Sequence, residues 1–474
     1  MNHRFVDLAA VWLLVAVSGC TARSQPDTGS ATMSSSTEPV VDPSTAKPDP
    51  DSEVKRKALK LVGHFAEGKF ADAVAMFDAP MAKAFTKEQA EATWKQLIQQ
   101  LGAYKSAEIG KIEQKDAFVR ATVSTEFDSA KVNLIVVFES GGQVTGFFVK
   151  PQTAESPWAP PGYAKSDSFT EEEVVVGDGE WALPGTLTLP KAAGAAKLPA
   201  IVLVHGSGPN DRDETIGASK PFKDLAWGLA SRGVAVLRYD KVTKTHGARF
   251  VAKWGDDITL ARETIDDALK AVALLRKDPR IDSKKIVYLG HSQGALAAPR
   301  AGKLDPTMAG LIIMAAPTRP LEEVALTQIE YLSTMAGANG EGAKQLLPAM
   351  REAVKLVKSP TLDPKTPTET LPLGIPAPFW LDMRGYKPDQ MAASLKMPVL
   401  VLQGEADYQV NMVDFAGWKK SVGSKANAKL KSYPGLLHSF IDCGCKLAKP
   451  DDYAKPGNVA LDVIDDIEKW VKAL

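Results

Sequence analysis

The amino-acid sequence predicts a doubly wound α/β domain, with an eight-stranded and mostly parallel sheet, that follows a small α+β domain. Three observations lead to this prediction. From about residue 169 onward, short apolar runs alternate with helical patterns, as in parallel sheets that carry helices on both faces. Residues 53–152 instead carry helical patterns followed by a group of strand patterns. One apolar run, Ile286–Leu289, leads directly into a Gly-x-Ser-x-Gly around Ser292.

The composition is that of a globular protein of two or three domains. Of the 474 residues, 45% are hydrophobic and 24% are charged, and the formal net charge is zero, so nothing indicates a nucleic-acid partner. The mildly basic segment around Lys241 and Lys244 is interpreted as a solvated loop.

The chain has three cysteines, and two of them are close together near the end. Cys443 and Cys445 are too near each other for the usual spacing of zinc ligands, and no pair of His or Cys residues lies nearby in the sequence. They form either a disulfide in an oxidising compartment or two free thiols in a loop.

Residues 1–20 are interpreted as an export signal. Arg4 precedes an apolar run, Leu8–Val17, that is too short to span a bilayer. The run ends in Val-Ser-Gly-Cys20, which resembles a bacterial lipobox. This resemblance implies a lipid anchor on Cys20 and a place in the cell envelope. Because Thr21 and not Asp follows, it implies the periplasmic face of the outer membrane or the cell surface, or the plasma membrane in a Gram-positive source. The alternative is plain secretion.

Residues 21–52 are rich in Ser, Thr, Pro, Asp and Ala and have almost no large apolar side chains. Such a segment cannot bury a core, so it is predicted to be a disordered tether.

Residues 53–152 are predicted to form the small α+β domain. A Gly141-Gly142 turn separates its last two strands. The order of elements resembles an uncharacterised cystatin-like module that precedes some bacterial secreted hydrolases. A proline-rich segment, 153–168, is predicted to be the linker to the next domain. The predicted helices are 54–65, 70–77 and 87–101, and the predicted strands are 117–123, 132–138 and 144–149.

Residues 169–474 carry the patterns of the α/β domain. The first two predicted strands form an antiparallel pair, and the later strands are continuous apolar runs, as expected for strands buried on both faces. The predicted strands are 172–176, 183–189, 200–204, 234–239, 286–289, 311–314, 399–402 and 429–433, and the main predicted helices are 222–231, 258–277 and 459–474.

The segment Gly290-His291-Ser292-Gln293-Gly294 follows a strand and precedes a helix of small residues. This pattern is typical of a nucleophile elbow, in which a sharp turn raises the serine hydroxyl above the sheet edge. It also brings the Gln293 N–H to a helix N-terminus, where it can face a developing oxyanion. A chance Gly-x-Ser-x-Gly is common, and the flanking strand and helix patterns are what favour the functional interpretation.

Together these features resemble the α/β-hydrolase superfamily, over about residues 165–474. The resemblance implies a triad in the order serine, acid, histidine. Of the six histidines, only His438 follows Ser292 at a distance that leaves room for the acid. The acid of the family follows the seventh strand, which implies Asp407, with Glu405 and Asp414 as alternatives. His438 would take the proton of Ser292, and Asp407 would orient the imidazole.

The oxyanion hole of such enzymes needs a second N–H donor. The loop His205-Gly206-Ser207-Gly208-Pro209 follows the third strand, and the resemblance implies Ser207 N–H as that donor, with Gly206 as the alternative. The acidic residues Asp211, Asp213 and Glu214 have no accompanying histidine, so they are interpreted as a solvated loop and not as a metal site.

His-Gly-Ser-Gly-Pro and Arg238-Tyr239-Asp240-Lys241 together resemble secreted hydrolases related to dienelactone hydrolases and acyl esterases. That subgroup continues Asp-Lys-Arg-Gly, whereas this chain continues with Val242 and Thr243, which leaves the shape of the nearby loop open.

About 80 residues, 317–396, separate the sixth and seventh strands, far more than a plain crossover needs. In this fold such an insertion implies a helical cap over Ser292. Phe379 and Trp380 are predicted to line the substrate pocket, with a purely structural role in the cap as the alternative.

The sequence therefore predicts a serine esterase that cleaves a small-molecule or glycan ester through an acyl-enzyme, without metal or cofactor. A serine peptidase or thioesterase would use the same triad. An alternative of another class is a non-catalytic envelope lipoprotein that binds a ligand.

Overall fold

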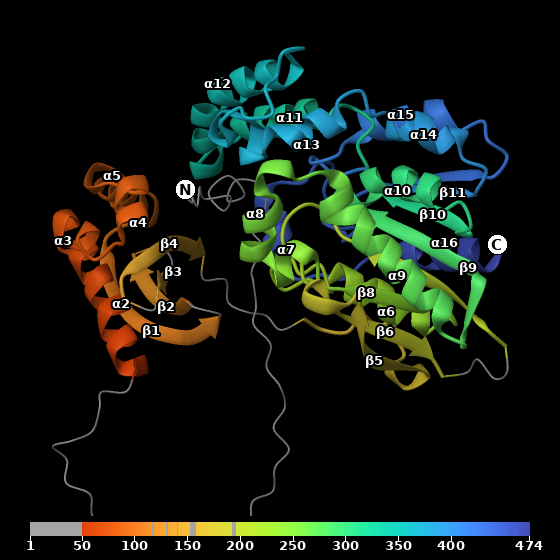
Figure 1. Cartoon of the computed structure of the whole chain (residues 1–474), viewed down its shortest axis with the longest axis horizontal. Helices are drawn as coiled ribbons and strands as arrows, with labels where there is room; N and C mark the ends of the chain where they lie inside the picture. Colours follow the sequence, from red (N-terminus) through yellow and green to blue (C-terminus); the bar gives the residue numbers. More distant parts are fainter. Residues whose placement is uncertain (1–49, 116–117, 129–130, 140, 152–157, 192–195) are drawn as a thin grey trace, which may run out of the picture. The chain divides into compact units, whose positions relative to one another are not determined.

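The computed structural model describes residues 50–115, 118–128, 131–139, 141–151, 158–191 and 196–474. These residues form two compact units, one before and one after residues 152–157 (Figure 1). The predicted export signal with Cys20, and the predicted tether up to residue 49, lie outside the described residues.

The first unit packs helices against a four-stranded antiparallel sheet in the order β1-β2-β3-β4. Its core contains a cluster of aromatic rings: those of Phe65 and Phe147 stack at 4.9 Å between centroids, and the ring of Trp94 lies 5.6 Å from that of Phe65. The helix of Trp94 is capped at its N-terminus by Thr86, which forms a capping box with Gln89. The elements are α2 (Pro50–Ala66), α3 (Phe70–Val74), α4 (Ala79–Ala84), α5 (Lys87–Leu101), β1 (Tyr104–Lys115), β2 (Phe118–Phe127), β3 (Lys131–Phe138) and β4 (Val144–Pro151).

The predicted small α+β domain is confirmed, but its first strand was missed. In β1 the alternation of Ala107 and Ile109 breaks, and the next apolar residue, Ile112, comes three positions later. The structure shows the reason: the register with β2 shifts between Ile109 and Ile112, around Gly110. A bulge of this kind changes which residues face the core and hides the period of two.

The second unit contains an eight-stranded sheet in the order β12-β11-β10-β9-β7-β8-β6-β5. β6 runs antiparallel to both β5 and β8, and every other pair is parallel, so the predicted doubly wound and mostly parallel sheet is confirmed. The strands are β5 (Phe169–Val176), β6 (Leu183–Pro190), β7 (Leu198–Val204), β8 (Ala235–Tyr239), β9 (Ile281–His291), β10 (Gly310–Met314), β11 (Val399–Gly404) and β12 (Ala428–Tyr433).

Two hydrophobic cores lie on opposite faces of this sheet. In β7, Ile201 and Leu203 belong to one core, whereas Val202 and Val204 belong to the other, as the alternation of side chains along a strand requires. The first core includes α6 (Pro221–Ala230) and α16 (Leu461–Lys472), and the second includes α9 (Asp266–Lys277) and α10 (Gln293–Leu304) (Figure 1).

Part of the segment predicted to be a linker packs on the second unit. Trp158 donates from Nε1 to the Asp224 carboxylate at 2.9 Å, and the Tyr163 hydroxyl donates to the Val459 carbonyl at 2.7 Å. Residues 158–168 are thus held in place by helix α6 and the start of the C-terminal segment. The prolines in this segment led to the prediction of a linker, whereas its aromatic side chains, Trp158 and Tyr163, make the contacts that hold it on the second unit.

The insertion between β10 and β11 is helical, with α11 (Leu321–Ser333), α12 (Ala338–Lys358), α13 (Ala377–Met383) and α14 (Pro388–Ser394). It is tied to the helix that follows Ser292. Arg300 on α10 pairs with Asp382 at 2.8 Å, and the Tyr386 hydroxyl donates to the Leu296 carbonyl at 2.8 Å. These contacts hold the insertion against α10.

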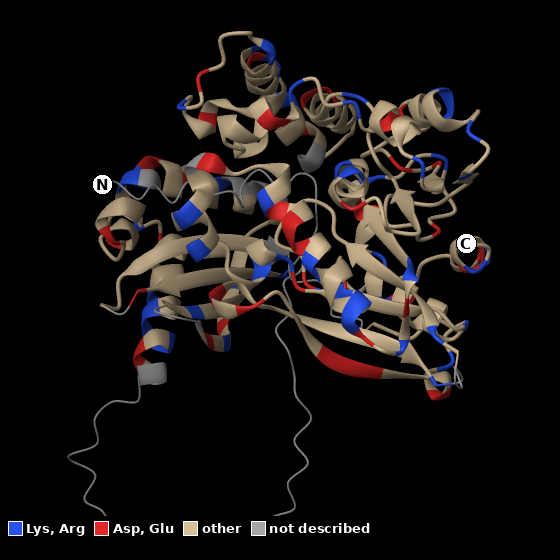
Figure 2. Cartoon of the chain, turned by 45° about the vertical axis from the view of Figure 1, so that its right-hand side comes forward, with Lys and Arg blue, Asp and Glu red and all other residues tan. Residues whose placement is uncertain are grey.

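Lysine and arginine are interspersed with aspartate and glutamate along the helices, strands and loops (Figure 2). None of the helices in the described part of the chain combines the length and the apolar character that crossing a bilayer would require.

Candidate active site

Ser292 lies in a strained turn between β9 and α10. Its φ is +53°, a conformation that non-glycine residues rarely adopt, and its N–H donates to the Met314 carbonyl at 2.9 Å. The two glycines of the motif are required by close backbone packing. A Cβ on Gly290 would lie 2.3 Å from the Gly294 backbone, and a Cβ on Gly294 would lie 2.1 Å from the Val204 carbonyl oxygen. Ser292 itself stays partly exposed at this turn.

His438 and Asp407 meet in the structure. His438 Nδ1 lies 2.6 Å from Asp407 Oδ2, and both residues are buried. The other Asp407 oxygen accepts from the N–H groups of Gln409 at 2.7 Å and Val410 at 3.0 Å. Because an ionised carboxylate only accepts hydrogen bonds, His438 Nδ1 is the donor in this contact.

The two alternative acids have other partners. Glu405 accepts from the Ser432 hydroxyl at 2.7 Å, and Asp414 on α15 (Met412–Val422) pairs with Arg319 at 2.7 Å. Of the three carboxylates considered from the sequence, Asp407 is the one that faces His438.

His291 connects the serine turn to the histidine loop. Its ring lies 4.6 Å from the His438 ring, centroid to centroid, and its Nε2 donates to the His438 carbonyl at 2.9 Å. Its Nδ1 lies 2.9 Å from Glu214 Oε2. Since Ser292 follows His291 directly, these contacts bring Ser292 and the loop of His438 to the same end of the sheet.

The prediction that Asp213 and Glu214 lie in a solvated loop is wrong. Glu214 is 3% exposed. Burial by itself would raise the pKa of Glu214, but its pairing with His291 outweighs this and lowers the pKa. For His291 burial acts against protonation, yet the charge of Glu214 raises its pKa. Both shifts favour a carboxylate–imidazolium pair. Sequence patterns do not indicate this pair, because the two residues are far apart along the chain.

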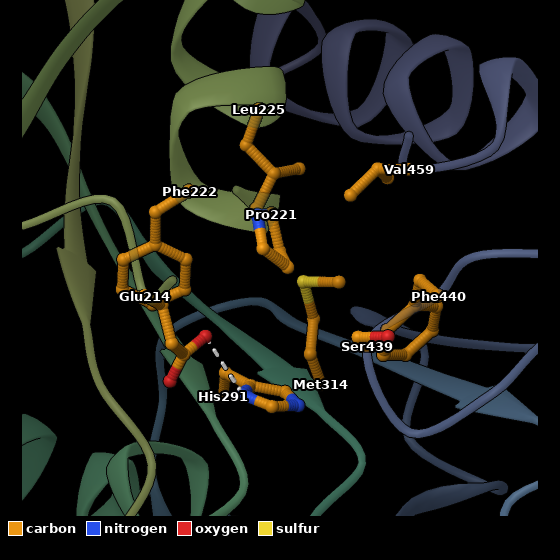
Figure 3. A pocket seen from close by; sticks show the side chains of 9 residues that line it. All are labelled: Glu214, Pro221, Phe222, Leu225, His291, Met314, Ser439, Phe440 and Val459. Atoms are coloured by element: carbon orange, nitrogen blue, oxygen red, sulfur yellow. Dashed lines mark ion pairs between the residues drawn. The ribbon is translucent and has the colours of Figure 1, made fainter. Parts of the chain in front are cut away.

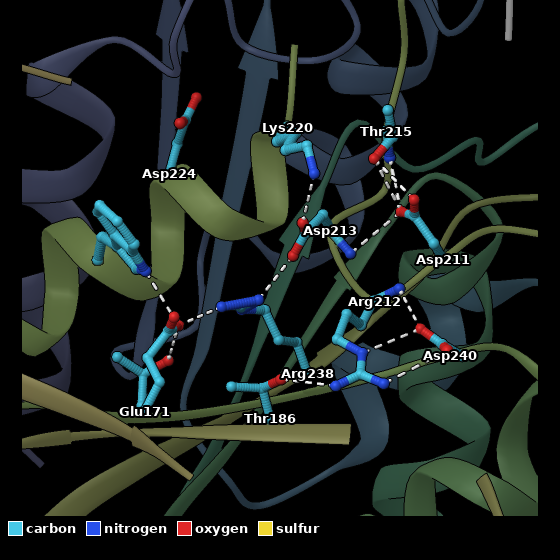
Figure 4. Close-up of polar contacts among 12 residues, drawn as sticks. Glu171, Thr186, Asp211, Arg212, Asp213, Thr215, Lys220, Asp224, Arg238 and Asp240 are labelled. Atoms are coloured by element: carbon cyan, nitrogen blue, oxygen red, sulfur yellow. Dashed lines mark hydrogen bonds and ion pairs between the residues drawn. The ribbon is translucent and has the colours of Figure 1, made fainter. Parts of the chain in front are cut away.

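Asp213 belongs to a second group of charges, in which Asp213 and Arg238 are buried (Figure 4). It pairs with Arg238 at 2.6 Å and with Lys220 at 2.9 Å, while Arg238 also contacts Glu171. These pairs join the loop after β7 to strands β8 and β5, and so fix the loop that carries Ser207.

That loop uses the Gly206 N–H internally. It donates to Glu214 Oε1 at 2.6 Å, which removes it as an oxyanion donor. The Ser207 N–H has no acceptor among the described residues, and Ser207 is exposed. A Cβ on Gly206 would lie 3.3 Å from Ser292 Cβ, so this loop runs beside the serine. Gln293 is the first residue of α10, where backbone N–H groups have no partner within the helix.

The prediction of a solvated loop at Lys241 is also wrong. Lys241 is 3% exposed, and its Nζ pairs with Glu263 at 2.8 Å. The partner lies on a different element, η4 (Ala261–Ile265), a turn of π-helix ahead of α9, and sequence patterns do not indicate such a pairing.

A small pocket lies behind the His291–Glu214 pair (Figure 3). Its other walls are almost entirely apolar, and neither Ser292 nor His438 lines it, so its place does not fit a substrate. Its lining residues are Glu214, Pro221, Phe222, Leu225, His291, Met314, Ser439, Phe440 and Val459.

Phe379 and Trp380 lie on α13 in the core between the insertion and the sheet. They are 2% and 1% exposed, and Trp380 Nε1 donates to the Ile375 carbonyl at 3.0 Å. Their burial favours the structural role. A part in substrate binding stays a prediction for both.

Cys443 and Cys445 form a disulfide, which decides between the two alternatives left by the sequence. It follows His438 in the same loop. No group of three or more His, Cys, Asp or Glu side chains within the described ranges could hold a metal ion.

Two comparisons with known proteins identify the family. Residues 196–442, which include Ser292, Asp407 and His438, match the family described as serine aminopeptidase, S33. The chain is also 33% identical over 419 residues to Esterase EstD of Thermotoga maritima, covering 88% of this chain and 95% of that protein. The chain belongs to the α/β-hydrolase superfamily.

Two solved structures are among those similar to this α/β-hydrolase. Est1E from Butyrivibrio proteoclasticus is 17% identical, with a TM-score of 0.42, over 64% of this chain and 99% of that one. The Pyrococcus furiosus esterase PF2001 is 14% identical, with a TM-score of 0.39, over 68% and 98%. In the first unit, residues 58–147 match a family described as a protein of unknown function.

Four charged residues around the serine turn of this α/β-hydrolase were not predicted from the sequence to form pairs: Glu214, Lys241, Glu263 and His291. Each was seen in the sequence as part of a loop, helix or motif without a partner. Their burial would have identified them, but a charged residue is seldom buried unless it has a partner. Here the partners come from other elements, so the sequence around each residue does not indicate its burial.

Proposed function

We propose that this α/β-hydrolase is a serine esterase that cleaves carboxylic esters through an acyl-enzyme. Ser292 is the nucleophile, His438 the base and Asp407 the orienting acid. The observation that carries the proposal is the 2.6 Å contact between His438 Nδ1 and Asp407, next to a strained serine turn. The esterase name of the 33% identical relative supports the choice of esters.

In the proposed mechanism, His438 Nε2 takes the Ser292 proton as Oγ attacks the ester carbonyl carbon. The N–H groups of Gln293 and Ser207 stabilise the oxyanion that forms. His438 then gives the proton to the departing alcohol, and the acyl group stays on Ser292. Water, activated by the same base, releases the acid. Asp407 keeps the Nδ1 hydrogen in place and stabilises the imidazolium. No metal or cofactor takes part.

Hydrolysis of p-nitrophenyl esters of increasing acyl length tests this proposal. We expect turnover of the acetate or butyrate by the chain without residues 1–20, and loss of that turnover in Ser292→Ala. Equal turnover by Ser292→Ala would reject Ser292 as the nucleophile.

A serine peptidase is the second candidate, because the matched family is described as a serine aminopeptidase. Aminoacyl p-nitroanilides distinguish the two. If these amides are cleaved with a higher kcat/KM than the esters, and Ser292→Ala abolishes the cleavage, the peptidase is the better description.

We also propose that the protein is anchored in the bacterial cell envelope through lipid on Cys20. The lipobox-like sequence supports this, and the Cys443–Cys445 disulfide fits an oxidising compartment. Incorporation of an alkyne-palmitate label into the membrane fraction of expressing bacteria tests it. Cys20→Ala should abolish both the label and the membrane association, and an equally labelled variant would refute the anchor.

A further inference from the structure

Lys241 is a buried cation that the proposed reaction does not use. Its side chain is 4% exposed and that of Glu263 is 12% exposed, and their charged atoms lie 2.8 Å apart. Burying two charges costs free energy that a pair recovers only with good geometry and further hydrogen bonds. Both members have such further bonds, and each bond leads to a backbone that carries a proposed oxyanion donor.

The first bond fixes the Ser207 donor. Lys241 Nζ donates to the Gly206 carbonyl at 2.9 Å, and Asn210 Nδ2 donates to the same oxygen at 3.1 Å. This carbonyl and the Ser207 N–H belong to one peptide unit, which is planar and trans, so the two groups point in opposite directions. Holding the carbonyl on Lys241 therefore aims the Ser207 N–H away from it. The cation also polarises the unit and strengthens the N–H as a donor.

The second bond fixes the Gln293 donor. Glu263 Oε2 accepts from Gln293 Nε2 at 2.9 Å, and the Thr264 hydroxyl lies 3.3 Å from the same nitrogen. Gln293 is 8% exposed and starts α10, so its side chain is held while its backbone N–H stands at the helix terminus. Glu263 reaches it from the π-helical turn η4, an irregularity that often marks functional sites.

We propose that the Lys241–Glu263 pair is a positioning pair that holds the two oxyanion donors, Ser207 N–H and Gln293 N–H, at a fixed separation. The described contacts of the two side chains are with each other, with the Gly206 carbonyl and with the Gln293 side chain, and none of these is with Ser292 or His438. The inference rests on the proposed function. Its physical basis is that donors oriented before the reaction stabilise the oxyanion without reorganising during it.

The test compares kcat with the affinity for an oxyanion-forming inhibitor. A trifluoromethyl ketone is attacked by Ser292 Oγ at its carbonyl carbon, the proton passes to His438, and a hemiketal oxyanion forms in the proposed hole. The double variant Lys241→Met with Glu263→Gln removes both charges and keeps the volumes close. The matched control is Arg276→Met with Asp305→Asn, another partly buried pair whose members lie on α9 and directly after α10.

We expect kcat for p-nitrophenyl butyrate to fall by about 10–100-fold, less than the loss expected on deleting a donor outright. The inhibition constant of the ketone should rise by a similar factor, while KM changes by less than about three-fold, since ground-state binding does not use the oxyanion. The control variant should keep the wild-type kcat and inhibition constant.

A folded double variant with wild-type kcat and ketone affinity would overturn the proposal. The proposal would also be overturned if activity fell only because fewer active sites could be titrated, while the remaining sites bound the ketone with normal affinity. If the double variant does not fold, Gln293→Met removes only the side-chain anchor, and unchanged kcat and ketone affinity in that variant overturn the proposal equally. Absence of both ester turnover and ketone binding in the wild type would instead refute the proposed function.

Discussion

His438 Nδ1 and Asp407 Oδ2 lie 2.6 Å apart, and three further N–H groups donate to the Asp407 carboxylate. Asp407→Asn keeps the shape but can present an amide N–H to the imidazole and favour the wrong tautomer. We expect kcat to fall by about 10³–10⁴-fold with little change in KM. Steady-state hydrolysis of p-nitrophenyl butyrate measures both constants.

Glu405→Gln serves as the control for this variant. Its carboxylate accepts from Ser432 and not from His438, so turnover should stay within about two-fold of wild type. Full turnover in Asp407→Asn together with loss in Glu405→Gln would move the acid to Glu405.

Backbone packing around the serine turn gives a prediction about stability. A Cβ on Gly294 would lie 2.1 Å from the Val204 carbonyl oxygen and 2.6 Å from that of His205, and neither strand end can yield easily. Gly294→Ala should lower the free energy of unfolding by about 1–3 kcal/mol in urea denaturation. Gly247→Ala, where a Cβ meets nothing within 4 Å, should stay within about 0.5 kcal/mol of wild type. Equal losses in both variants would contradict the packing account.

The Glu214–His291 pair predicts a pH dependence of stability. The contribution of protonated His291 to the free energy of unfolding is complete below pH 6.5 and is lost as the pH rises through the raised pKa of His291. The contribution of ionised Glu214 is complete above pH 4.5 and is lost as the pH falls through the lowered pKa of Glu214. Glu214→Gln keeps an acceptor for the Gly206 N–H but removes the charge. The stability advantage of wild type over this variant should be greatest between pH 4.5 and 6.5 and shrink above it.

Urea denaturation of both proteins from pH 5 to pH 9 measures this advantage. A difference that is constant over the whole range would mean that the two side chains do not form an ion pair.

Phe379 tests the role of the insertion. Because Phe379 is 2% exposed, Phe379→Leu should lower the free energy of unfolding by about 1–2 kcal/mol and leave the preferred acyl length unchanged. Urea denaturation and the p-nitrophenyl ester series measure the two effects. An unchanged stability with a shifted acyl preference would favour the pocket role.

The sequence predicted those features that depend on residues close together along the chain. The buried strands of the parallel sheet appear as continuous apolar runs, and the turn at Ser292 needs glycines at positions 290 and 294, so both were visible in the sequence. Strand β1 was missed because its bulge interrupts the alternation.

Charged residues around the site were misinterpreted for a different reason. The segments around Lys241 and Glu214 have the composition of solvated loops. The partners of these two residues, Glu263 and His291, come close to them only in the folded chain. The Asp407–His438 pair could be inferred because chain order restricts the family's triad, whereas no such order restricts a positioning pair.

Labelling with a fluorophosphonate, followed by peptide mass spectrometry, tests the nucleophile most directly. We predict one equivalent of phosphonate on the peptide that contains Ser292, with loss of ester turnover in proportion to the label. Label on another residue, or continued turnover in the fully labelled protein, would contradict the assignment of Ser292 as the nucleophile.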